Sequence, residues 1–425
     1  MHRRKAIQPT LFAVLVLCLC SCSRDSSPTG PLPPQVLRVQ PDGLGDVPTI
    51  QAAIDSLEDG GVIELDDGTF AGDGNRDLDF GGKALTICSR SGDPDFCTID
   101  CAADTLDPHR GFRFHSGEGP GSVLEAVTIT RGCMDFGGAI YCDSSSSPSI
   151  VGCVFRLNVA AVSGGAVLCF RGASPSFVEC VFDSNRAELF GGAVYTPYAS
   201  PSFRDCMFEG GHARLGAGFA TYGNCYSRIS GCRFTHHWAQ FGGAVYCRDA
   251  GMIIEHCTFR ENGSRWCGAG IYCYWDAYPL IDHCTFIRNA SICGASISSD
   301  GGSHIQVIHC TLYANSGKRG AGVECDVWGT AIIQDTIIAG STWGMAVHCR
   351  DEGSRIYLQR CDLYGNDGGD WVGCAESQLG HDGNVSVDPM FCDPAQGVFT
   401  LRPESPCASG VDGDDAMGAW GLGCE

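Results

Sequence analysis

Cysteine recurs at a nearly constant interval through most of the chain, with threonine replacing it once. Successive members of this column stand 27, 26, 26, 25, 27, 26, 26 and 25 residues apart, and each has an apolar residue two positions later and another three positions earlier. The members are Cys153, Cys180, Cys206, Cys232, Cys257, Cys284, Cys310, Thr336 and Cys361. Because side chains alternate along a strand, the cysteine and the apolar residue two positions later share one face. A chain with this repeat returns to the same side of a coil in each period, as in a solenoid.

A second column stands five residues after the first and is mostly asparagine. Its asparagines are Asn158, Asn185, Asn262, Asn289, Asn315 and Asn366, and the other places hold Gly211, His237 and Ser341. Asparagine tolerates the left-handed backbone, so we interpret this column as a repeated tight bend. Paired glycines followed by Ala and then Val or Ile predict a further turn in each period. We expect an all-β fold, a single-stranded right-handed parallel β-helix of about 26 residues per coil.

The ends of the repeat predict caps. Apolar residues between Thr49 and Leu57 fall at helical spacing, and paired glycines follow, so we expect a short N-terminal helix that covers the first coil. Strands at 62–65, 78–80 and 85–87 begin the winding. We assign residues 41–390 to the β-helix and 391–425 to a C-terminal cap, with a disulfide between Cys392 and Cys407 as its expected staple.

The first residues resemble a bacterial targeting segment. A basic start and an apolar run at 11–19 predict a signal peptide over residues 1–21. Leu19-Cys20-Ser21-Cys22 resembles the lipobox, which implies a lipid attached to Cys22. Residues 22–40 then read as a polar tether. We expect a protein anchored by its lipid in a bacterial cell envelope, at the outer membrane or the cell surface.

Composition narrows the range of partners. The chain has 49 acidic against 28 basic residues and a formal charge of −21, so we expect no nucleic-acid partner. Of its 28 cysteines, 25 lie after the targeting segment. This odd number forbids complete pairing, and we interpret the cysteine column as small apolar filling of a narrow interior.

These motifs resemble the pectin-lyase-like right-handed β-helix superfamily over residues 41–390. Phe-x-x-Asn, as at Phe155 and Asn158, combined with Gly-Gly-Ala-Val or Ile, is similar to the repeat of chlamydial polymorphic outer-membrane proteins. That resemblance implies a surface adhesin, whereas the superfamily also contains polysaccharide lyases, hydrolases and epimerases. We expect a non-catalytic protein that binds a glycan or a surface partner; a polysaccharide lyase, hydrolase or epimerase is the alternative.

Several motifs could carry chemistry of the alternative kind. Asp107-Pro108-His109 looks like a motif of mannuronan epimerases but has no tyrosine close upstream. Acidic and amide residues alternate from Asp73 to Asp79 as in a calcium loop, yet Leu78 replaces the required glycine and favours a strand. A carboxylate and arginine cluster in one lateral groove would favour an enzyme. We expect no catalytic residue, no metal site and no cofactor.

Exposed aromatic residues are the candidates for glycan contact, since flat rings on a rigid strip can stack on sugar rings. The candidate residues are Tyr274, Trp275, Tyr278 and Trp328. Outward histidines at 256, 283 and 309 each precede a column cysteine and form a looser candidate metal platform. The expected partner is a polysaccharide or a surface glycoprotein, and the expected state is a monomer.

Overall fold

The computed structural model describes residues 34–408 and 416–424. The predicted signal peptide, the lipid attachment at Cys22 and the tether up to residue 33 lie outside these described residues. The described residues from 35 onward form one compact unit. Within the described residues, every helix is too short or too polar for a membrane-crossing segment.

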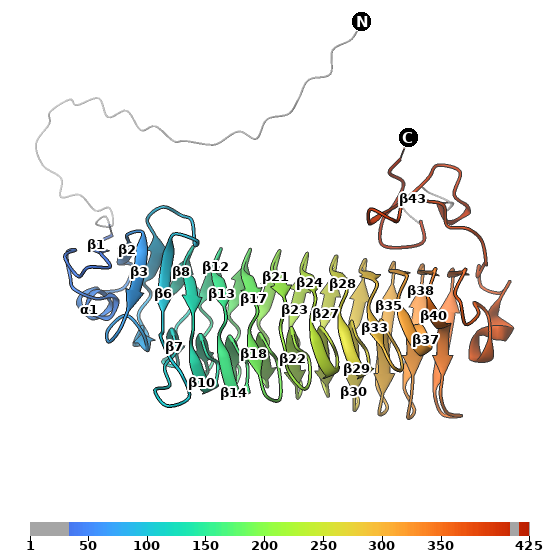
Figure 1. The fold of residues 1–425 in the computed structure, drawn as a ribbon, viewed down its shortest axis with the longest axis horizontal. Coiled ribbons are helices and arrows are strands. Elements are labelled where there is room, and N and C mark those ends of the chain that lie inside the picture. The colour runs from blue at the N-terminus through green and yellow to red at the C-terminus, as the bar shows by residue number, and fades with distance from the viewer. Residues whose placement is uncertain (1–33, 409–415, 425) are drawn as a thin grey trace, which may run out of the picture. The chain divides into compact units, whose positions relative to one another are not determined.

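The unit is a stack of coils whose strands pair in parallel, and the expected right-handed parallel β-helix is confirmed (Figure 1). Sheet A has 13 strands. They are β1 (Val36–Val39), β2 (Val62–Leu65), β5 (Thr86–Ser89), β8 (Val123–Glu125), β12 (Ser149–Val151), β16 (Ser176–Val178), β20 (Ser202–Arg204), β23 (Arg228–Ser230), β27 (Ile253–Glu255), β31 (Leu280–Asp282), β35 (His304–Ile308), β38 (Thr330–Gln334) and β41 (Arg355–Gln359). The first strand begins at Val36, within the segment assigned to the tether.

Sheet B follows sheet A in every coil after the first and has 12 strands. They are β3 (Gly68–Ala71), β6 (Cys97–Asp100), β9 (Thr128–Thr130), β13 (Val154–Arg156), β17 (Val181–Asp183), β21 (Met207–Glu209), β24 (Arg233–Thr235), β28 (Thr258–Arg260), β32 (Thr285–Ile287), β36 (Thr311–Tyr313), β39 (Ile337–Ala339) and β42 (Asp362–Tyr364).

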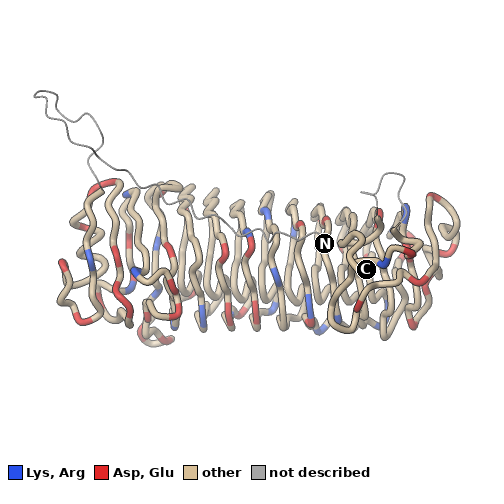
Figure 2. The backbone as a smooth tube through the Cα atoms, turned by 90° about the horizontal axis from the view of Figure 1, so that it is seen from above, with Lys and Arg blue, Asp and Glu red and all other residues tan. Residues whose placement is uncertain are grey.

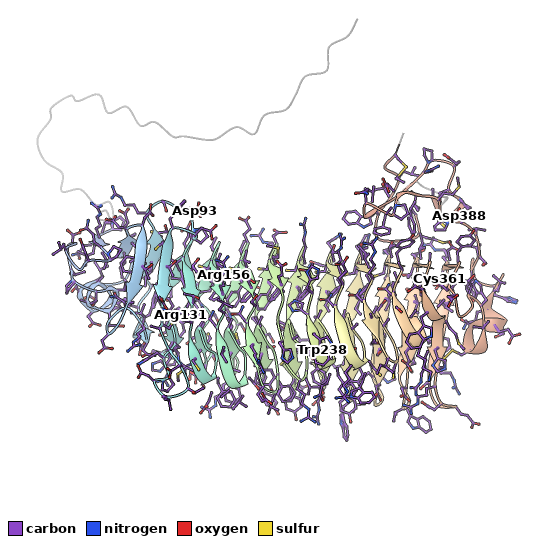
Figure 3. The ribbon with its side chains drawn as sticks, in the orientation of Figure 1. Asp93, Arg131, Arg156, Trp238, Cys361 and Asp388 are labelled. Atoms are coloured by element: carbon purple, nitrogen blue, oxygen red, sulfur yellow. A yellow bond between two sulfur atoms is a disulfide. The ribbon has the colours of Figure 1, made fainter. Side chains whose placement is uncertain are left out.

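Sheet C is bent, and we call its two parts the first arm and the second arm. The first arm contains β10 (Cys133–Phe136), β14 (Val159–Ser163), β18 (Arg186–Ala187), β25 (Trp238–Phe241), β29 (Gly263–Cys267) and β33 (Ala290–Ser291). The second arm contains β4 (Leu78–Asp79), β7 (Phe112–Phe114), β11 (Ile140–Cys142), β15 (Val167–Cys169), β19 (Val194–Pro197), β22 (Phe219–Tyr222), β26 (Val245–Arg248), β30 (Ile271–Tyr274) and β34 (Ile297–Asp300). The longer strands β37 (Ser316–Cys325) and β40 (Trp343–Cys349) run through both arms. Trp238 of β25 marks the first arm in Figure 3.

The paired glycines turn the chain between the two arms. Gly164 has φ +70, in the left-handed region that favours glycine. A Cβ atom on its neighbour Gly165 would lie 2.0 Å from the carbonyl oxygen of Gly192 in the next coil. Any larger residue there would push the coils apart, so the turn predicted from the sequence requires glycine at this place.

The interior is a set of stacked identical side chains. Phe155 pairs with Phe182, and Phe182 with Phe208, in direct register across sheet B. Their ring centroids lie 4.9 and 4.6 Å apart and their planes are nearly parallel. The column cysteines are buried free thiols. The predicted apolar interior is therefore confirmed, and dispersion contacts between like shapes hold each coil on the next.

The asparagine column marks a repeated bend, as predicted, but asparagine is not the left-handed residue of that bend. The left-handed residue of the bend is the one before the asparagine, for example Arg288 with φ +51, while the asparagine side chain points inward. Asn289 Nδ2 donates to the carbonyl oxygen of Phe259 at 2.9 Å, and its Oδ1 accepts from the backbone N–H of Asn262 at 3.1 Å. The asparagines thus form a buried hydrogen-bond ladder that satisfies backbone groups of the bend.

His237 occupies one rung of this ladder. Its Nδ1 accepts from the backbone N–H of Gly211 at 3.0 Å, and its own backbone N–H donates to Asn262 Oδ1 at 3.1 Å. Burial lowers the pKa of His237 to about 4, because the charged imidazolium would lose its hydration.

The predicted N-terminal helix is confirmed. Helix α1 (Ile50–Ser56) is capped by Thr49, whose Oγ1 accepts from the backbone N–H of Ala52 at 3.2 Å. Ile50, Ala53 and Ile54 are buried in the apolar core of the unit. The spacing of these residues alone fixed which face of the helix turns inward.

In the C-terminal part of the described chain, two segments cover the stack of coils. The short 3₁₀ helix η1 (Gly373–Gln378) packs Ala375 into the apolar core, next to the last coil. The antiparallel pair β43 (Phe391–Asp393) and β44 (Val398–Leu401) instead packs against outward residues of sheet B, as does Trp420, whose Nε1 donates to Thr285 Oγ1 at 2.9 Å. A second 3₁₀ helix, η2, spans Pro406–Ala408. The described part of the segment expected as a cap thus covers a side of the stack.

The expected staple between Cys392 and Cys407 is wrong. Cys392 is bonded to Cys424, and a second disulfide joins Cys349 to Cys374. Cys407 stays a buried thiol whose Sγ lies 3.3 Å from a carboxylate oxygen of Asp362. Sequence spacing could not choose among these partners, because it does not fix how the irregular C-terminal segment folds back.

We expect Asn289→Ala to lower the free energy of unfolding by about 2 to 4 kcal/mol, because two buried backbone groups lose their partner. The denaturation midpoint in urea measures the change. Gln306→Ala is the matched control, since Gln306 is an exposed amide on β35. An effect of Asn289→Ala no larger than that of the control would contradict the ladder's structural role.

We expect the unfolding free energy of the wild type to fall as the pH drops from about 6.5 to about 4, relative to that of His237→Asn. In this window an unfolded histidine binds a proton, whereas the buried His237, with its pKa near 4, does not. Over this pH range, the unfolding free energy of the wild type should fall by about 3 kcal/mol relative to that of His237→Asn. His304→Asn, a change at an exposed histidine, is the control and should leave the pH profile unaltered. Parallel profiles for the wild type and His237→Asn would contradict the prediction.

Candidate ligand groove on sheet C

The bend of sheet C creates a lateral groove, because outward side chains of the two arms face each other across it. At the bend, Phe190, Leu215, Phe241 and Cys267 are neighbours in successive coils. Along the second arm one outward column continues through many coils in direct register. It runs Asp79, Arg113, Tyr141, Leu168, Tyr195, Ala220, Tyr246, Tyr272, Ser298, Glu324 and His348.

Aromatic rings form the central part of the groove, a hollow of about 600 Å³. Phe190 lies 6.1 Å from Tyr246 and Phe241 lies 5.1 Å from Tyr272, measured between ring centroids, so each pair spans the bend. Tyr246 and Tyr272 are almost fully buried as its floor, whereas Phe190 and Phe241 are half-buried. The lining residues are Leu189, Phe190, Arg214, Leu215, Phe241, Tyr246, Arg248, Tyr272, Tyr274 and Asp300.

Arg248 lies among the rings of this hollow. Its guanidinium carbon is 5.1 Å from the ring centroid of Tyr222 and 5.7 Å from those of Tyr274 and Trp275. Its Nε is buried and has no hydrogen-bond partner among the described residues. Stacking on aromatic faces stabilises a guanidinium without neutralising it, so Arg248 keeps a positive charge beside the hollow.

Asp300 closes the hollow on the side of the next coil. The hydroxyl of Tyr272 donates to Asp300 Oδ2 at 2.6 Å. Burial raises the pKa of Asp300 and strongly raises that of Tyr272, since both ionised forms would lose hydration there.

A second hollow of about 380 Å³ continues the groove and shares Phe241 and Asp300 with the first. Its lining residues are Phe241, Trp266, Cys267, Ile292, Cys293, Asp300, Lys318, Arg319, Asp326 and Arg350. Together the two hollows are lined by five basic residues (214, 248, 318, 319, 350) and two acidic ones (300, 326). Elsewhere acidic residues are spread over the coils and both ends (Figure 2). The groove is thus locally basic in a protein of charge −21.

The four aromatic residues predicted for glycan contact have different places. Tyr274 lines the central hollow, and Trp275 is exposed at its edge beside Arg248. Trp328 borders a further hollow, of about 680 Å³, which shares Asp326 and Arg350 with the second. Tyr278 lies outside these three hollows, where its hydroxyl donates to that of Tyr226 at 3.0 Å.

Sequence reasoning missed most of the aromatic residues of the groove. A signal was present, since a tyrosine follows the glycine-rich motif at positions 141, 195, 246 and 272. Phe190 and Phe241 stand directly before the paired glycines in the periods of Tyr195 and Tyr246. Only the bend, however, brings the residues before and after the glycines face to face.

The N-terminal part of the same outward column holds a polar cluster around a hollow of about 480 Å³. It is lined by Asp77, Asp79, Arg110, Arg113, Met134 and Tyr141. His109 Nδ1 lies 2.5 Å from Asp77 Oδ2, and the guanidinium of Arg110 lies 5.0 Å from the Tyr141 ring centroid. Burial raises the pKa of Tyr141 and lowers that of Arg110. Tyr141, from a later coil, thus lies beside Arg110, the residue that follows His109 in the chain.

In the alternating motif from Asp73 to Asp79 and in the histidine column at 256, 283 and 309, several polar side chains have partners within the protein. Leu78 and Phe80 are buried as expected for a strand, and Asp79 Oδ2 lies 2.9 Å from His115 Nε2. The outward histidines stack with ring centroids 4.9 and 4.5 Å apart along residues 256, 283 and 309. Asp282 Oδ1 lies 2.9 Å from His283 Nδ1 and 3.2 Å from His309 Nδ1, so these groups partner one another.

Known proteins are similar to this chain in fold, and no curated protein matches its sequence. Pectate lyase Pel9A shows 13% identity with a TM-score of 0.46, over 92% of this chain and 96% of that one. A PL6 family alginate lyase, AlyGC, shows 10% identity with a TM-score of 0.48, over 92% of this chain but 57% of the lyase. PfbA, a surface adhesin of Streptococcus pneumoniae, shows 10% identity with a TM-score of 0.38, over 75% of this chain and 85% of the adhesin.

Structural likeness at these identities concerns the fold and carries no information on ligand or reaction. The resemblance of the repeat to polymorphic outer-membrane proteins stays a prediction. Residues 191–363 match the family described as the right handed beta helix region, which agrees with the coil geometry of this part of the chain.

Proposed function

We propose that the groove on sheet C binds an anionic polysaccharide and does not cleave it. The observation that carries this proposal is the guanidinium of Arg248, held among three aromatic rings in an open hollow of about 600 Å³. Aromatic faces stack on the apolar faces of sugar rings, and a guanidinium pairs with carboxylate or sulfate groups.

The charge of the groove supports an anionic ligand. No ion pair joins Arg214, Arg248 or Lys318 to a carboxylate among the described residues. In a chain of charge −21, three such cations in one groove attract anionic groups locally while the rest of the surface repels them. The hollows that meet at Phe241 and Asp300 suit an extended chain, since a polymer can pass from one to the next.

We also propose that this binding takes place in a bacterial cell envelope, with the protein anchored through a lipid on Cys22. The support is the sequence of residues 1–22, because that part lies outside the described residues. An adhesive role toward surface glycans fits this location, and a monomer suffices for it because the groove lies within one chain.

We expect the full chain to bind oligogalacturonate more tightly than a neutral glucan oligomer, measured by isothermal titration calorimetry. Arg248→Met should weaken oligogalacturonate binding roughly tenfold, since it removes one charged contact. Phe241→Ala should weaken binding of both ligands by roughly 3- to 10-fold through lost stacking.

Matched controls lie on the other sheets. Arg233→Met changes an exposed arginine of β24, and Tyr357→Ala changes an exposed tyrosine of β41. Both should bind like the wild type. The proposal would be contradicted if oligogalacturonate did not bind. It would also be contradicted if the groove variants and the control variants lost the same amount of affinity.

The cluster around Tyr141 favours a second candidate function, cleavage of a polysaccharide. The hollow combines Tyr141 with the partly buried Arg110 and with Asp77, whose carboxylate contacts His109. A tyrosine and a histidine can exchange protons with a sugar, and an arginine can stabilise a negative charge. The outward column from Asp79 to Tyr272 connects this cluster to the aromatic hollow.

If the second candidate holds, polygalacturonate or alginate incubated with the full chain should yield unsaturated products that absorb ultraviolet light or new reducing ends. Tyr141→Phe should then reduce the rate by at least about 100-fold. Tyr357→Phe serves as the control. Lack of product from both polymers would eliminate this candidate and leave the binding function alone.

A further inference from the structure

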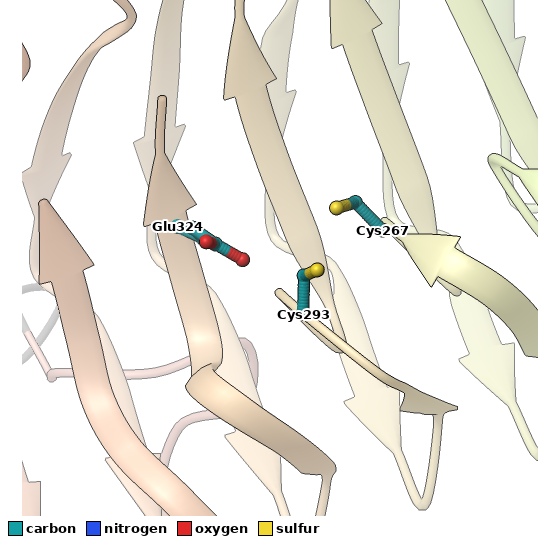
Figure 4. A group of neighbouring side chains, drawn as sticks. All are labelled: Cys267, Cys293 and Glu324. Carbon is teal, nitrogen blue, oxygen red and sulfur yellow. The ribbon is translucent and has the colours of Figure 1, made fainter. Parts of the chain in front are cut away.

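Two cysteines that line the second hollow lie beside a buried glutamate, and Figure 4 shows the three side chains pointing toward one another. Cys267 Sγ, Cys293 Sγ and a carboxylate oxygen of Glu324 all lie within 4.8 Å of one another, and they come from three successive coils. Neither cysteine belongs to the interior columns. Both stand in the first arm or just after it, where they line the hollow with Trp266 and Arg319.

Glu324 is buried, and only one of its two carboxylate oxygens has partners. Its exposed fraction is 1%, and its Oε2 has no hydrogen-bond partner among the described residues. Its Oε1 is 3.3 Å from the guanidinium of Arg319 and 3.8 Å from His348 Nδ1. A buried carboxylate oxygen without a partner is costly, so its position requires an explanation.

The backbone has room for this glutamate because of a glycine. A Cβ atom on Gly294 would lie 2.6 Å from the Cβ of Glu324 and 2.8 Å from its Oε2. The unpartnered oxygen is therefore packed beside Gly294, directly between the coil of Cys293 and its own. The cluster is built into the arm by three coils and does not depend on an exposed loop.

We propose that Cys267, Cys293 and Glu324 bind a zinc-type divalent metal ion through two thiolates and one carboxylate oxygen, with the fourth position open to the second hollow. Thiolate and carboxylate ligands suit zinc, and tetrahedral coordination places such donor atoms about 3.5 Å apart, within reach of the present spacing. This proposal revises the expectation, drawn from the sequence, that the chain has no metal site, and it does not rest on polysaccharide binding.

The charges balance when the ion is bound. Each thiol gives up one proton to solvent on coordination, so two protons leave as one doubly charged cation enters. Two thiolates, one carboxylate and the cation leave a single negative charge, which Arg319 offsets. Without a cation, burial and the neighbouring Glu324 raise the pKa of Cys267, which keeps that thiol protonated.

The second cluster of potential ligands, Asp282 with His283 and His309, is the natural comparison. There the carboxylate oxygen already has imidazole partners at 2.9 and 3.2 Å, and the three side chains are partly exposed. A disulfide between Cys267 and Cys293 is the other arrangement that would occupy these sulfurs. The experiment distinguishes a metal ion at Cys267, Cys293 and Glu324 from a metal ion at Asp282, His283 and His309 and from a Cys267–Cys293 disulfide.

The test uses the full chain, treated with a chelator and then titrated with Co²⁺ and Zn²⁺. We expect one equivalent of Co²⁺ with thiolate-to-cobalt absorption, displaced by Zn²⁺, and release of two protons. Cys293→Ser should weaken Zn²⁺ binding at least about 100-fold and Glu324→Gln at least about 10-fold. Alkylation mapped on peptides should show Zn²⁺ protecting Cys267 and Cys293, which distinguishes this site from Cys18, Cys20 and Cys22.

Cys88→Ser and His283→Gln are the controls, and both should bind Zn²⁺ like the wild type while circular dichroism verifies that all variants fold. Three results would overturn the proposal. They are no uptake of either metal, uptake that persists in Cys293→Ser, and recovery of Cys267 and Cys293 as a disulfide-linked pair from the unreduced protein.

Discussion

Hydrogen bonding between successive coils, in one fixed register, is the constraint on which the rest of this structure depends. From β8 onward the strands of the three sheets pair with partners about 26 residues away, so an inserted or missing residue must be absorbed in a turn. The first coils are less regular, since Thr86 of β5 pairs with Val123 of β8. The buried asparagine ladder enforces this register at the bend after sheet B, because each amide bonds to backbone groups of the neighbouring coil. His237 shows that another side chain serves when its ring nitrogen can accept the same bond.

The same register organises the outside of the coils. When the interior columns are aligned, outward residues are aligned as well, and the second arm carries one continuous outward column from Asp79 to His348. Aromatic residues in this column meet those at the bend because the paired glycines allow the two arms to fold toward each other. A groove with a strip of rings thus follows from coil stacking, and the few charged residues placed on it set its local charge.

Charge distinguishes this groove from the rest of the surface. Arg248 is held by three rings, whereas Glu324 is buried without a partner for one of its oxygens. At both places the fold keeps an ionisable group in an environment that packing alone does not favour. Such places are where function is expected, because stability would be served better by neutral residues.

The sequence by itself determined the coil length, the inward residues and the N-terminal helix. These features depend on spacing along the chain, as the stacked Phe155, Phe182 and Phe208 and the buried face of α1 show. It indicated an aromatic strip through Tyr274 and Trp275 but did not identify Phe241 or Tyr246 as its core. The repeat did not single out Cys267 or Cys293.

Tertiary structure decided which outward residues meet. The angle at the Gly-Gly bend places Phe241 opposite Tyr272, and the stacking of three coils gathers Cys267, Cys293 and Glu324. It also paired Cys392 with Cys424, since the C-terminal segment returns along the side of sheet B. Distances across coils follow from the bend and from long-range packing, and neither is encoded in a local repeat of residue types.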